Sequence, residues 1–271
     1  MAKIILGLLA VYLVVVVFLY TSQRRLMYHP TPTKPVISEE AKAYGFAETS
    51  LTTSDGLSLN AWYRPPEAGK PVMIHFHGNS FDLSYFLPEM TDYLDEGMGV
   101  LLFDYRGFGG NPGDINKPGL LNDARAAIDF VMETENLVPK DIIYFGKSLG
   151  TGISTTMAAE RSPAALILES PYTTIADVAA DKYWFIPFVK YLMRDNFSVI
   201  DHIANIDAPL IVLHAVPDVT VPMKFGKRSF DAANHPKEMH EFAEANHGNL
   251  HEHGAHPKVI DFLRAHGLLG D

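Results

Sequence analysis

Residues 142–150 read IIYFGKSLG, a short apolar run followed by a Gly-x-Ser-x-Gly pentapeptide. The apolar run is typical of a buried strand, and residues 151–160 can continue as a helix. Glycines on both sides of Ser148 permit a tight strand-to-helix turn, because a Cβ at position 146 or 150 would collide with its neighbours. Such a turn strains the serine backbone and exposes the hydroxyl. Ser148 is therefore the first candidate for a nucleophile.

Strand-like and helix-like segments alternate on both sides of this turn. Further apolar runs occur at 72–76, 99–103, 165–168 and 210–213. Helix-like segments cover 120–135, 151–160, 223–233 and 250–266. Before them, 46–53 and 57–63 flank Ser54-Asp55-Gly56 and are typical of a hairpin. The pattern predicts an α/β fold with a mostly parallel, doubly wound sheet and helices on both faces.

One segment, residues 172–205, interrupts the alternation and is too long for a plain loop. It contains the aromatic run YWFIPF at 183–188. One interpretation is a small helical cap over the active site that contacts an acyl or other apolar group. The other is a pair of amphipathic helices that pack on the sheet edge, and the two interpretations are compatible.

Composition narrows the classes of partner. The 271 residues carry a formal net charge of −10, which argues against nucleic acid or polyanionic substrates. The chain has no cysteine, so disulfides, thiolate nucleophiles and cysteine-based zinc sites are excluded.

The N-terminus carries an uncharged apolar run, Ile4–Tyr20. As a helix it would span roughly 25 Å at about 1.5 Å per residue, near the lower limit for a bilayer crossing. We expect a single-pass membrane anchor over residues 1–23. A cleaved signal peptide is the first alternative, although no small-x-small cleavage site follows, and a buried N-terminal helix is the second. Lys3 and the terminal amine together roughly balance Arg24 and Arg25, so the positive-inside rule assigns no side of the membrane.

The sequence after the anchor divides into two parts. Residues 24–40 contain Pro30, Pro32 and Pro35 and favour an extended, semi-rigid linker. Residues 41–271 are predicted to form the catalytic domain.

A serine nucleophile needs a base, and the base needs an orienting carboxylate. In parallel α/β sheets these groups gather at the C-terminal strand ends, with the acid after the serine and the histidine last. Asp218 follows the apolar run 210–213 and is the candidate acid; Glu169, at the end of the preceding run, is its rival. His247 lies in a loop before the terminal helix and is the candidate base.

The remaining histidines offer a metal interpretation. His247, His251 and His253 have spacings that can bring ligands together, and His256 lies nearby, although such clusters are usually solvated surface histidines. His75 and His77 alternate at a strand end and could bind zinc, but structural histidines are the simpler interpretation.

The stretch His77-Gly78-Asn79 ends the strand-like run 72–76. A sharp turn at Gly78 would aim a backbone N–H at the serine. The predicted oxyanion hole therefore consists of the backbone amides of Asn79 and Leu149. A neighbouring loop begins Asp104-Tyr105-Arg106-Gly107, and we expect Asp104 to pair with Arg106 and fix it.

Together these motifs resemble the α/β-hydrolase superfamily over roughly residues 45–266. The resemblance rests on 77–79, on 104–109, on 146–150, and on Asp218 followed by His247, in that order. The anchor, the loop 104–109 and the segment 192–197 resemble a membrane-anchored branch with bacterial serine hydrolases and eukaryotic depalmitoylases. The resemblance implies Ser148 as nucleophile, His247 as base and then acid, and Asp218 as orienting acid. The family usually has Gly-Asp-x-Asp where this chain has AVPD at 215–218.

The function implied is hydrolysis of a carboxylic ester or thioester through an acyl-enzyme on Ser148. It requires no cofactor and no metal, and the expected partners are a small-molecule or acyl substrate and the membrane. One alternative is a serine peptidase of the same fold, although no amine-binding carboxylate stands out. Another is a catalytically silent binding protein, supported only by the altered acid loop.

Overall fold

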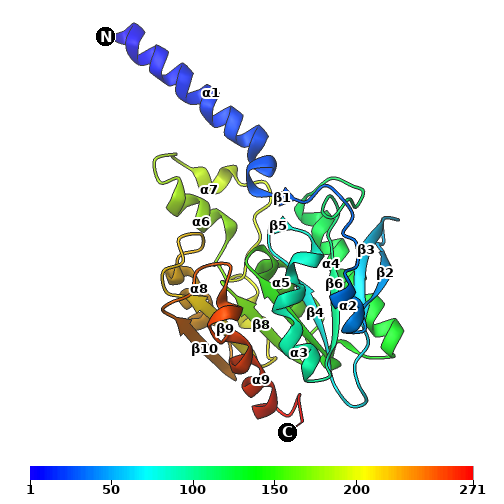
Figure 1. Cartoon of the computed structure of the whole chain (residues 1–271). Helices are drawn as coiled ribbons and strands as arrows, with labels where there is room; N and C mark the ends of the chain where they lie inside the picture. Colours follow the sequence, from blue (N-terminus) through cyan, green and yellow to red (C-terminus); the bar gives the residue numbers. More distant parts are fainter. Residues whose placement is uncertain (271) are drawn as a thin grey trace.

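The computed structural model describes residues 1–270. Helix α1 (Ala2–Met27) projects from a rounded domain that contains the remaining elements, so that the N-terminus lies far from the body (Figure 1). None of the α1 side chains is fully buried.

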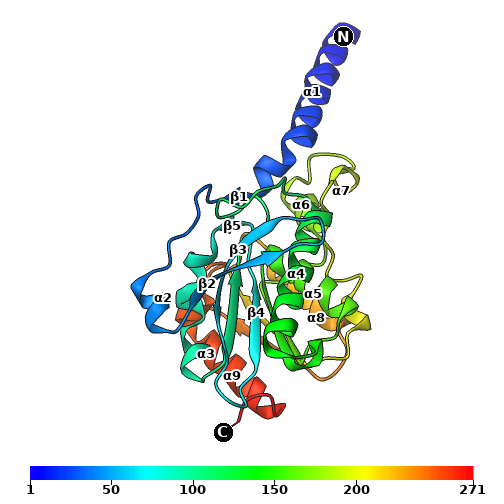
Figure 2. The same ribbon diagram turned by 90° about the vertical axis from the view of Figure 1, so that its right-hand side faces the viewer.

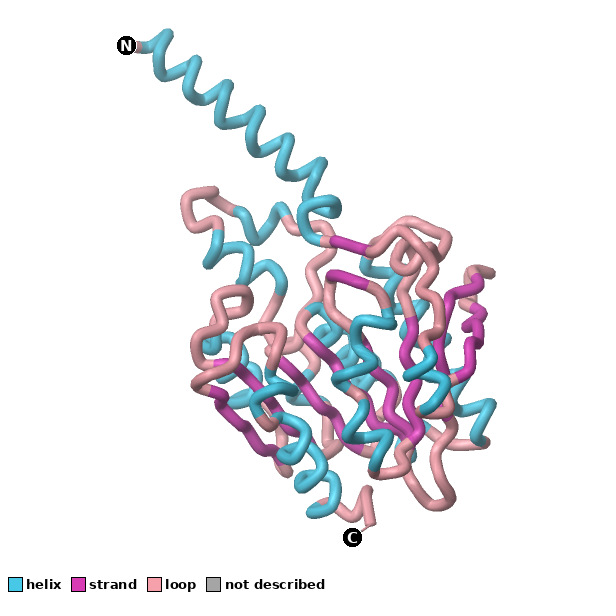
Figure 3. The backbone as a smooth tube through the Cα atoms, in the orientation of Figure 1, coloured by secondary structure: helices cyan, strands magenta, loops and turns pink. Residues whose placement is uncertain are grey.

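A central sheet crosses the domain (Figure 3). Its strand order is β10-β9-β8-β7-β4-β6-β3-β2. The strands are β2 (Ala47–Thr52), β3 (Ser58–Arg64), β4 (Val72–Phe76), β6 (Gly99–Phe103), β7 (Ile142–Lys147), β8 (Ala165–Glu169), β9 (Leu210–Ala215) and β10 (Lys237–Phe242). From β10 to β6 neighbouring strands are parallel, and β3 and β2 complete the sheet as an antiparallel hairpin. The predicted mostly parallel sheet is confirmed.

Helices cover both faces of the sheet, as Figure 2 shows. One face packs on α4 (Lys117–Glu135), α5 (Leu149–Glu160) and α8 (Met223–Ala232). The other packs on α2 (Glu39–Ala43), α3 (Thr91–Asp95) and α9 (Ala255–Ala265). Strands β4, β6 and β8 are buried along their whole length, which is why they appear in the sequence as continuous apolar runs.

The predicted cap segment forms two short helices, α6 (Ile175–Lys182) and α7 (Val189–Leu192). The helix predicted over 250–266 is interrupted: a 3-10 turn (Leu250–His253) ends at Gly254, whose φ of +85° lies in the left-handed region, and α9 starts after it.

The segment predicted as a linker, residues 24–40, contains regular structure. Helix α1 continues to Met27, beyond the predicted boundary at 23, because Arg24 and Arg25 are good helix formers. Strand β1 (His29–Pro30) then pairs with β5 (Ser80–Phe81), and Tyr28 is buried. The chain is therefore attached to the domain directly after α1.

Candidate active site

The Gly-x-Ser-x-Gly turn joins β7 to α5. Ser148 has φ of 51° and ψ of −116°, a strained conformation for a residue with a side chain. A Cβ on Gly146 would lie 2.1 Å from the Ser154 hydroxyl, and one on Gly150 would lie 1.8 Å from the carbonyl oxygen of Phe76. Only glycine fits at either position. The half-buried Ser148 hydroxyl is thereby presented at the C-terminal end of the sheet.

Three side chains from separate loops meet at this turn. His247 Nε2 lies 2.9 Å from Ser148 Oγ, and His247 Nδ1 lies 2.7 Å from Asp218 Oδ2. Asp218 follows β9 and His247 follows β10, so the parallel sheet brings their loops to the same edge as Ser148. A hydrogen-bonded chain therefore runs from a buried carboxylate through an imidazole to a hydroxyl.

Asp218 is held firmly although its loop lacks the first acidic residue. Its Oδ1 accepts hydrogen bonds from the backbone amides of Thr220 and Val221, both at 2.8 Å. Burial alone would raise the pKa of Asp218, but the hydrogen bond and charge of His247 together hold that pKa below its ordinary value. The carboxylate stays ionised beside the imidazole.

The predicted oxyanion residues lie beside the serine. Asn79 and Leu149 both line the pocket that contains Ser148. Leu149 is the first residue of α5, so its N–H has no acceptor within the helix. A Cβ placed on Gly78 would lie 3.6 Å from the Ser148 Cβ, which shows how closely the loop after β4 passes the serine. Both predicted oxyanion residues thus lie in the same pocket as the serine.

Comparison with known proteins identifies the family. A protein of Mycobacterium tuberculosis, uncharacterized protein Rv2307c, is 37% identical over 225 residues, 82% of this chain and 79% of its own length. The chain belongs to the α/β-hydrolase superfamily. Residues 68–195 of this α/β-hydrolase match the family described as serine aminopeptidase, S33. The resemblance predicted from the ordered motifs is confirmed.

One further relative and one solved structure are also similar to this chain. Lysophosphatidylserine lipase ABHD12 of Danio rerio is 29% identical over 237 residues, 75% of this chain and 61% of the lipase. The Pyrococcus furiosus esterase Pf2001 has the same fold, with a TM-score of 0.72 over 88% of this chain and 97% of the esterase, at 18% identity.

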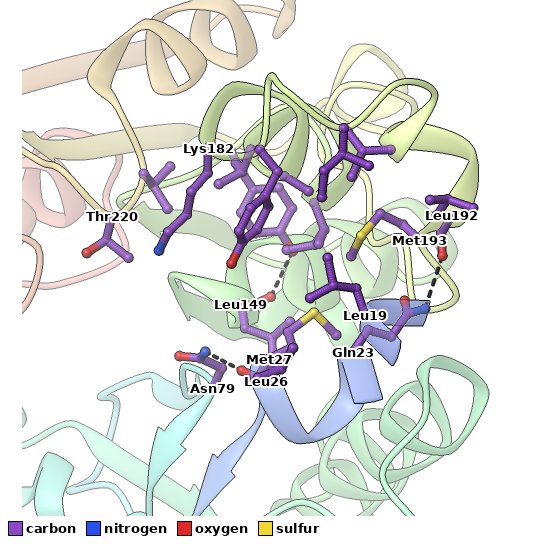
Figure 4. A pocket seen from close by; sticks show the side chains of 18 of the residues that line it. Leu19, Gln23, Leu26, Met27, Asn79, Leu149, Lys182, Leu192, Met193 and Thr220 are labelled. Carbon is purple, nitrogen blue, oxygen red and sulfur yellow. Dashed lines mark hydrogen bonds between the residues drawn. The ribbon is translucent and has the colours of Figure 1, made fainter. Parts of the chain in front are cut away.

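The pocket above Ser148 in this α/β-hydrolase has a volume of about 240 Å³ and is mainly apolar. Its walls come from α1, from the cap helices α6 and α7, and from the loop after β9. Figure 4 shows Leu149 near its centre, with residues of α1 on one side. The polar residues of the lining carry no carboxylate; they are Gln23, Asn79, Ser148, Thr220, Lys182 and the tyrosines 20, 172 and 183.

A buried ion cluster that the sequence analysis did not predict supports the turn. Lys147 Nζ lies 2.6 Å from Glu89 Oε1 and 2.9 Å from Glu169 Oε1, with all three side chains buried. Glu169, the rival acid, therefore pairs with Lys147 instead of His247. Burial raises the pKa of Glu89 to about 7. The sequence signal that could have predicted this cluster was Lys147 itself, because a lysine at the end of a buried strand needs a buried acidic partner.

The pairing predicted for the loop 104–109 is wrong. Arg106 binds Asp123 and Asp55, with nitrogen–oxygen distances of 2.8 Å to each. Asp104 instead accepts a hydrogen bond from the backbone amide of Leu83 at 2.8 Å. The two side chains have separate partners, and their closeness in the sequence therefore did not predict a pair.

The histidines considered as metal ligands lie in different environments. His75 and His77 are fully buried against aromatic rings, and burial lowers the pKa of His77 to about 4. His251 Nδ1 lies 3.8 Å from Glu89, and His256 Nδ1 lies 2.9 Å from Asp92. Within residues 1–270 no group of three or more metal-ligating side chains comes together.

Proposed function

We propose that this protein is a membrane-anchored serine hydrolase that cleaves carboxylic esters or thioesters through an acyl-enzyme on Ser148. The observation that carries the proposal is the hydrogen-bonded chain Ser148–His247–Asp218, with distances of 2.9 and 2.7 Å. A serine hydroxyl is a weak nucleophile until a positioned base can take its proton. In this arrangement His247 is that base, and ionised Asp218 fixes its ring and stabilises the imidazolium.

The proposed reaction proceeds in two halves. Ser148 Oγ attacks the acyl carbon while its proton passes to His247 Nε2, and the backbone amides of Asn79 and Leu149 donate to the oxyanion. His247 then protonates the leaving alcohol or thiol, and the acyl group stays on Ser148. Water attacks this acyl-enzyme with His247 again as base, which releases the acid and restores the serine.

The anchor is the second part of the proposal. Among the described residues, α1 is the helix long and apolar enough to cross a membrane. Its last turn is bound to the domain: Gln23 donates to the backbone carbonyl of Leu192 at 3.0 Å, and Arg24 binds Asp195. A cleaved signal peptide would lose these contacts, so they favour a retained helix. The relative ABHD12 is named as a lysophosphatidylserine lipase, and a lipid substrate agrees with an enzyme held at a membrane.

Peptide hydrolysis is the alternative, because the matched family is described as a serine aminopeptidase. A peptide amino-terminus needs a carboxylate partner, and the described pocket lining offers none. Side-by-side assays with aryl esters and aminoacyl amides separate the two activities. Faster turnover of the amides would reverse the ranking.

A fluorophosphonate probe tests the nucleophile. We expect the full-length protein to be labelled at Ser148, and Ser148→Ala to remain unlabelled while it keeps its circular dichroism spectrum. Equal labelling of both proteins would refute the assignment. An unlabelled wild type would instead favour a silent binding protein.

A further inference from the structure

The substrate pocket extends from the catalytic serine to the membrane helix. The α1 residues in its lining recur every three or four positions and therefore form one face of the helix: Val16, Leu19, Tyr20, Gln23, Leu26 and Met27. From Val16 to Met27 this face spans roughly 16 Å at about 1.5 Å per residue. The opposite wall consists of apolar cap residues, among them Ile186, Val189 and Leu192.

The α1 wall is fixed to the domain by hydrogen bonds on two sides. On the cap side, the Gln23 side chain bonds the backbone of Leu192 and Arg194, at 3.0 and 2.8 Å. On the other side, the Asn79 side-chain amide donates to the backbone carbonyl of Met27 at 2.5 Å. The helix face is thus held against the loop that carries the predicted oxyanion amide.

The pocket is more polar at one end than at the other. Figure 4 shows Lys182 and Thr220 on one side of Leu149, and Leu19, Leu192 and Met193 on the other. Gln23 also lies on this second side, where its side chain donates to the backbone carbonyl of Leu192. The apolar end leads along α1 toward the part of the helix that would lie in a bilayer. A chain of methylenes fits that end, while a polar leaving group fits the end near Lys182.

The tip of the cap also suits a membrane surface. Trp184, Phe188 and Tyr191 are exposed to 81%, 77% and 86%. Figures 1 and 2 both place this tip beside the lower part of α1, on the side of the domain from which the helix leaves. Trp and Tyr are enriched where a membrane meets water, and contiguous exposed apolar residues mark interaction sites. The exposed cap tip and α1 therefore lie on the same side of the domain.

We infer that α1 is one wall of an acyl-chain site, and that the substrate is a long-chain lipid ester that reaches Ser148 from the bilayer between α1 and the cap. The inference rests on the proposed function, since it supplies the substrate class for that same serine. Moving an acyl chain through water carries a free-energy cost that grows with every methylene. A chain that slides from lipid into a pocket lined by an intramembrane helix avoids this cost.

Two adjacent valines on α1 give a matched test. Val16 is half-buried in the pocket lining, whereas Val17 is 53% exposed and lies outside the lining. Full-length V16W and V17W have the same composition and the same apolar helix. Each is reconstituted in phosphatidylcholine vesicles, and kcat/KM is measured for a palmitoyl and a butyryl ester.

We expect V16W to lower the palmitoyl-to-butyryl ratio of kcat/KM about tenfold or more, which corresponds to roughly two methylenes losing their contacts. V17W should keep the wild-type ratio. Identical ratios in V16W and V17W would overturn the acyl site and leave the hydrolase intact. If the wild type hydrolyses neither ester, the proposed function itself fails.

A photoreactive probe gives a readout independent of turnover. A long-chain fluorophosphonate with a diazirine at the far end of its chain is attached to Ser148 and irradiated. Crosslinks to residues 16–27 or to the cap helices support the inference. Crosslinks confined to other parts of the domain contradict it.

Discussion

Arg24, in the last turn of α1, donates two hydrogen bonds to Asp195, from Nε at 2.6 Å and from Nη2 at 3.0 Å. Asp195 is almost fully buried and also accepts the backbone amide of Lys117 at 3.0 Å. Helix α1, the later part of the cap segment and the start of α4 thus share one carboxylate. This ion pair therefore helps to fix the last turn of α1 to the domain, together with the hydrogen bonds of Gln23 and Asn79.

Removing this ion pair should loosen α1 from the domain. We expect Arg24→Gln to lower the free energy of unfolding by about 1.5–3 kcal/mol, the usual contribution of hydrogen bonds to a charged group. Arg25 is exposed, and its side chain makes no ion pair among residues 1–270, so Arg25→Gln is the matched control and should be nearly neutral. Denaturant unfolding in detergent measures both. Equal losses would mean that helix charge, rather than the contact with Asp195, matters.

A substitution at Asp218 can test its role in orienting His247 without disturbing the fold. Asp218→Asn can keep the side-chain oxygen that accepts the amides of Thr220 and Val221, but its amide cannot accept the His247 N–H. We expect kcat/KM for an aryl ester to fall about 10³- to 10⁴-fold with little change in stability. Glu169→Gln alters the rival acid and should cost far less activity. The reverse order would move the orienting carboxylate to Glu169.

Lys147 should be important for stability. Lys147→Met leaves Glu89 and Glu169 buried without a cation, a change that typically costs about 3–5 kcal/mol. The triple variant with Glu89→Gln and Glu169→Gln removes both charges and should recover most of that loss. Denaturant unfolding compares the three proteins. A triple variant as unstable as Lys147→Met would show that packing, not charge, is responsible.

The sheet and the meeting of Ser148, Asp218 and His247 could be predicted because each depends on local sequence and strand direction. Buried parallel strands leave apolar runs, and their C-terminal ends meet at one edge. Contacts between segments that are distant in the chain produce no comparable pattern in the sequence. The Arg106 partners Asp55 and Asp123 lie in a hairpin turn and in α4. The pocket face of α1 gave no signal because residues 4–20 of this helix are uncharged and mainly apolar on all sides.

If the cap tip contacts the membrane as inferred, removing that contact should lower the rate of hydrolysis only for substrate in the membrane. Replacing Trp184, Phe188 and Tyr191 by serine removes the exposed tip, so we expect a several-fold lower rate on long-chain esters in vesicles. The rate on a water-soluble butyryl ester should stay unchanged. Val138 is also exposed but precedes β7, at the other end of the sheet, so Val138→Ser is the control. Equal loss on soluble and vesicle substrates would indicate a damaged cap instead.

Asp104 should make stability depend on pH. Burial raises its pKa from 3.8 to about 8, so the folded protein keeps a proton that the unfolded chain has lost between these values. The unfolding free energy must then fall as pH rises across this window, by at most about 1.4 kcal/mol per unit. Asp104→Asn keeps an oxygen for the Leu83 amide and removes this contribution, so it should gain stability relative to the wild type as pH rises. Nearby His77, whose pKa is lowered, is present in both proteins. The measurement is therefore the difference in unfolding free energy between Asp104→Asn and the wild type as a function of pH. A difference that stays constant from pH 4 to 8 would show that Asp104 does not hold the proton.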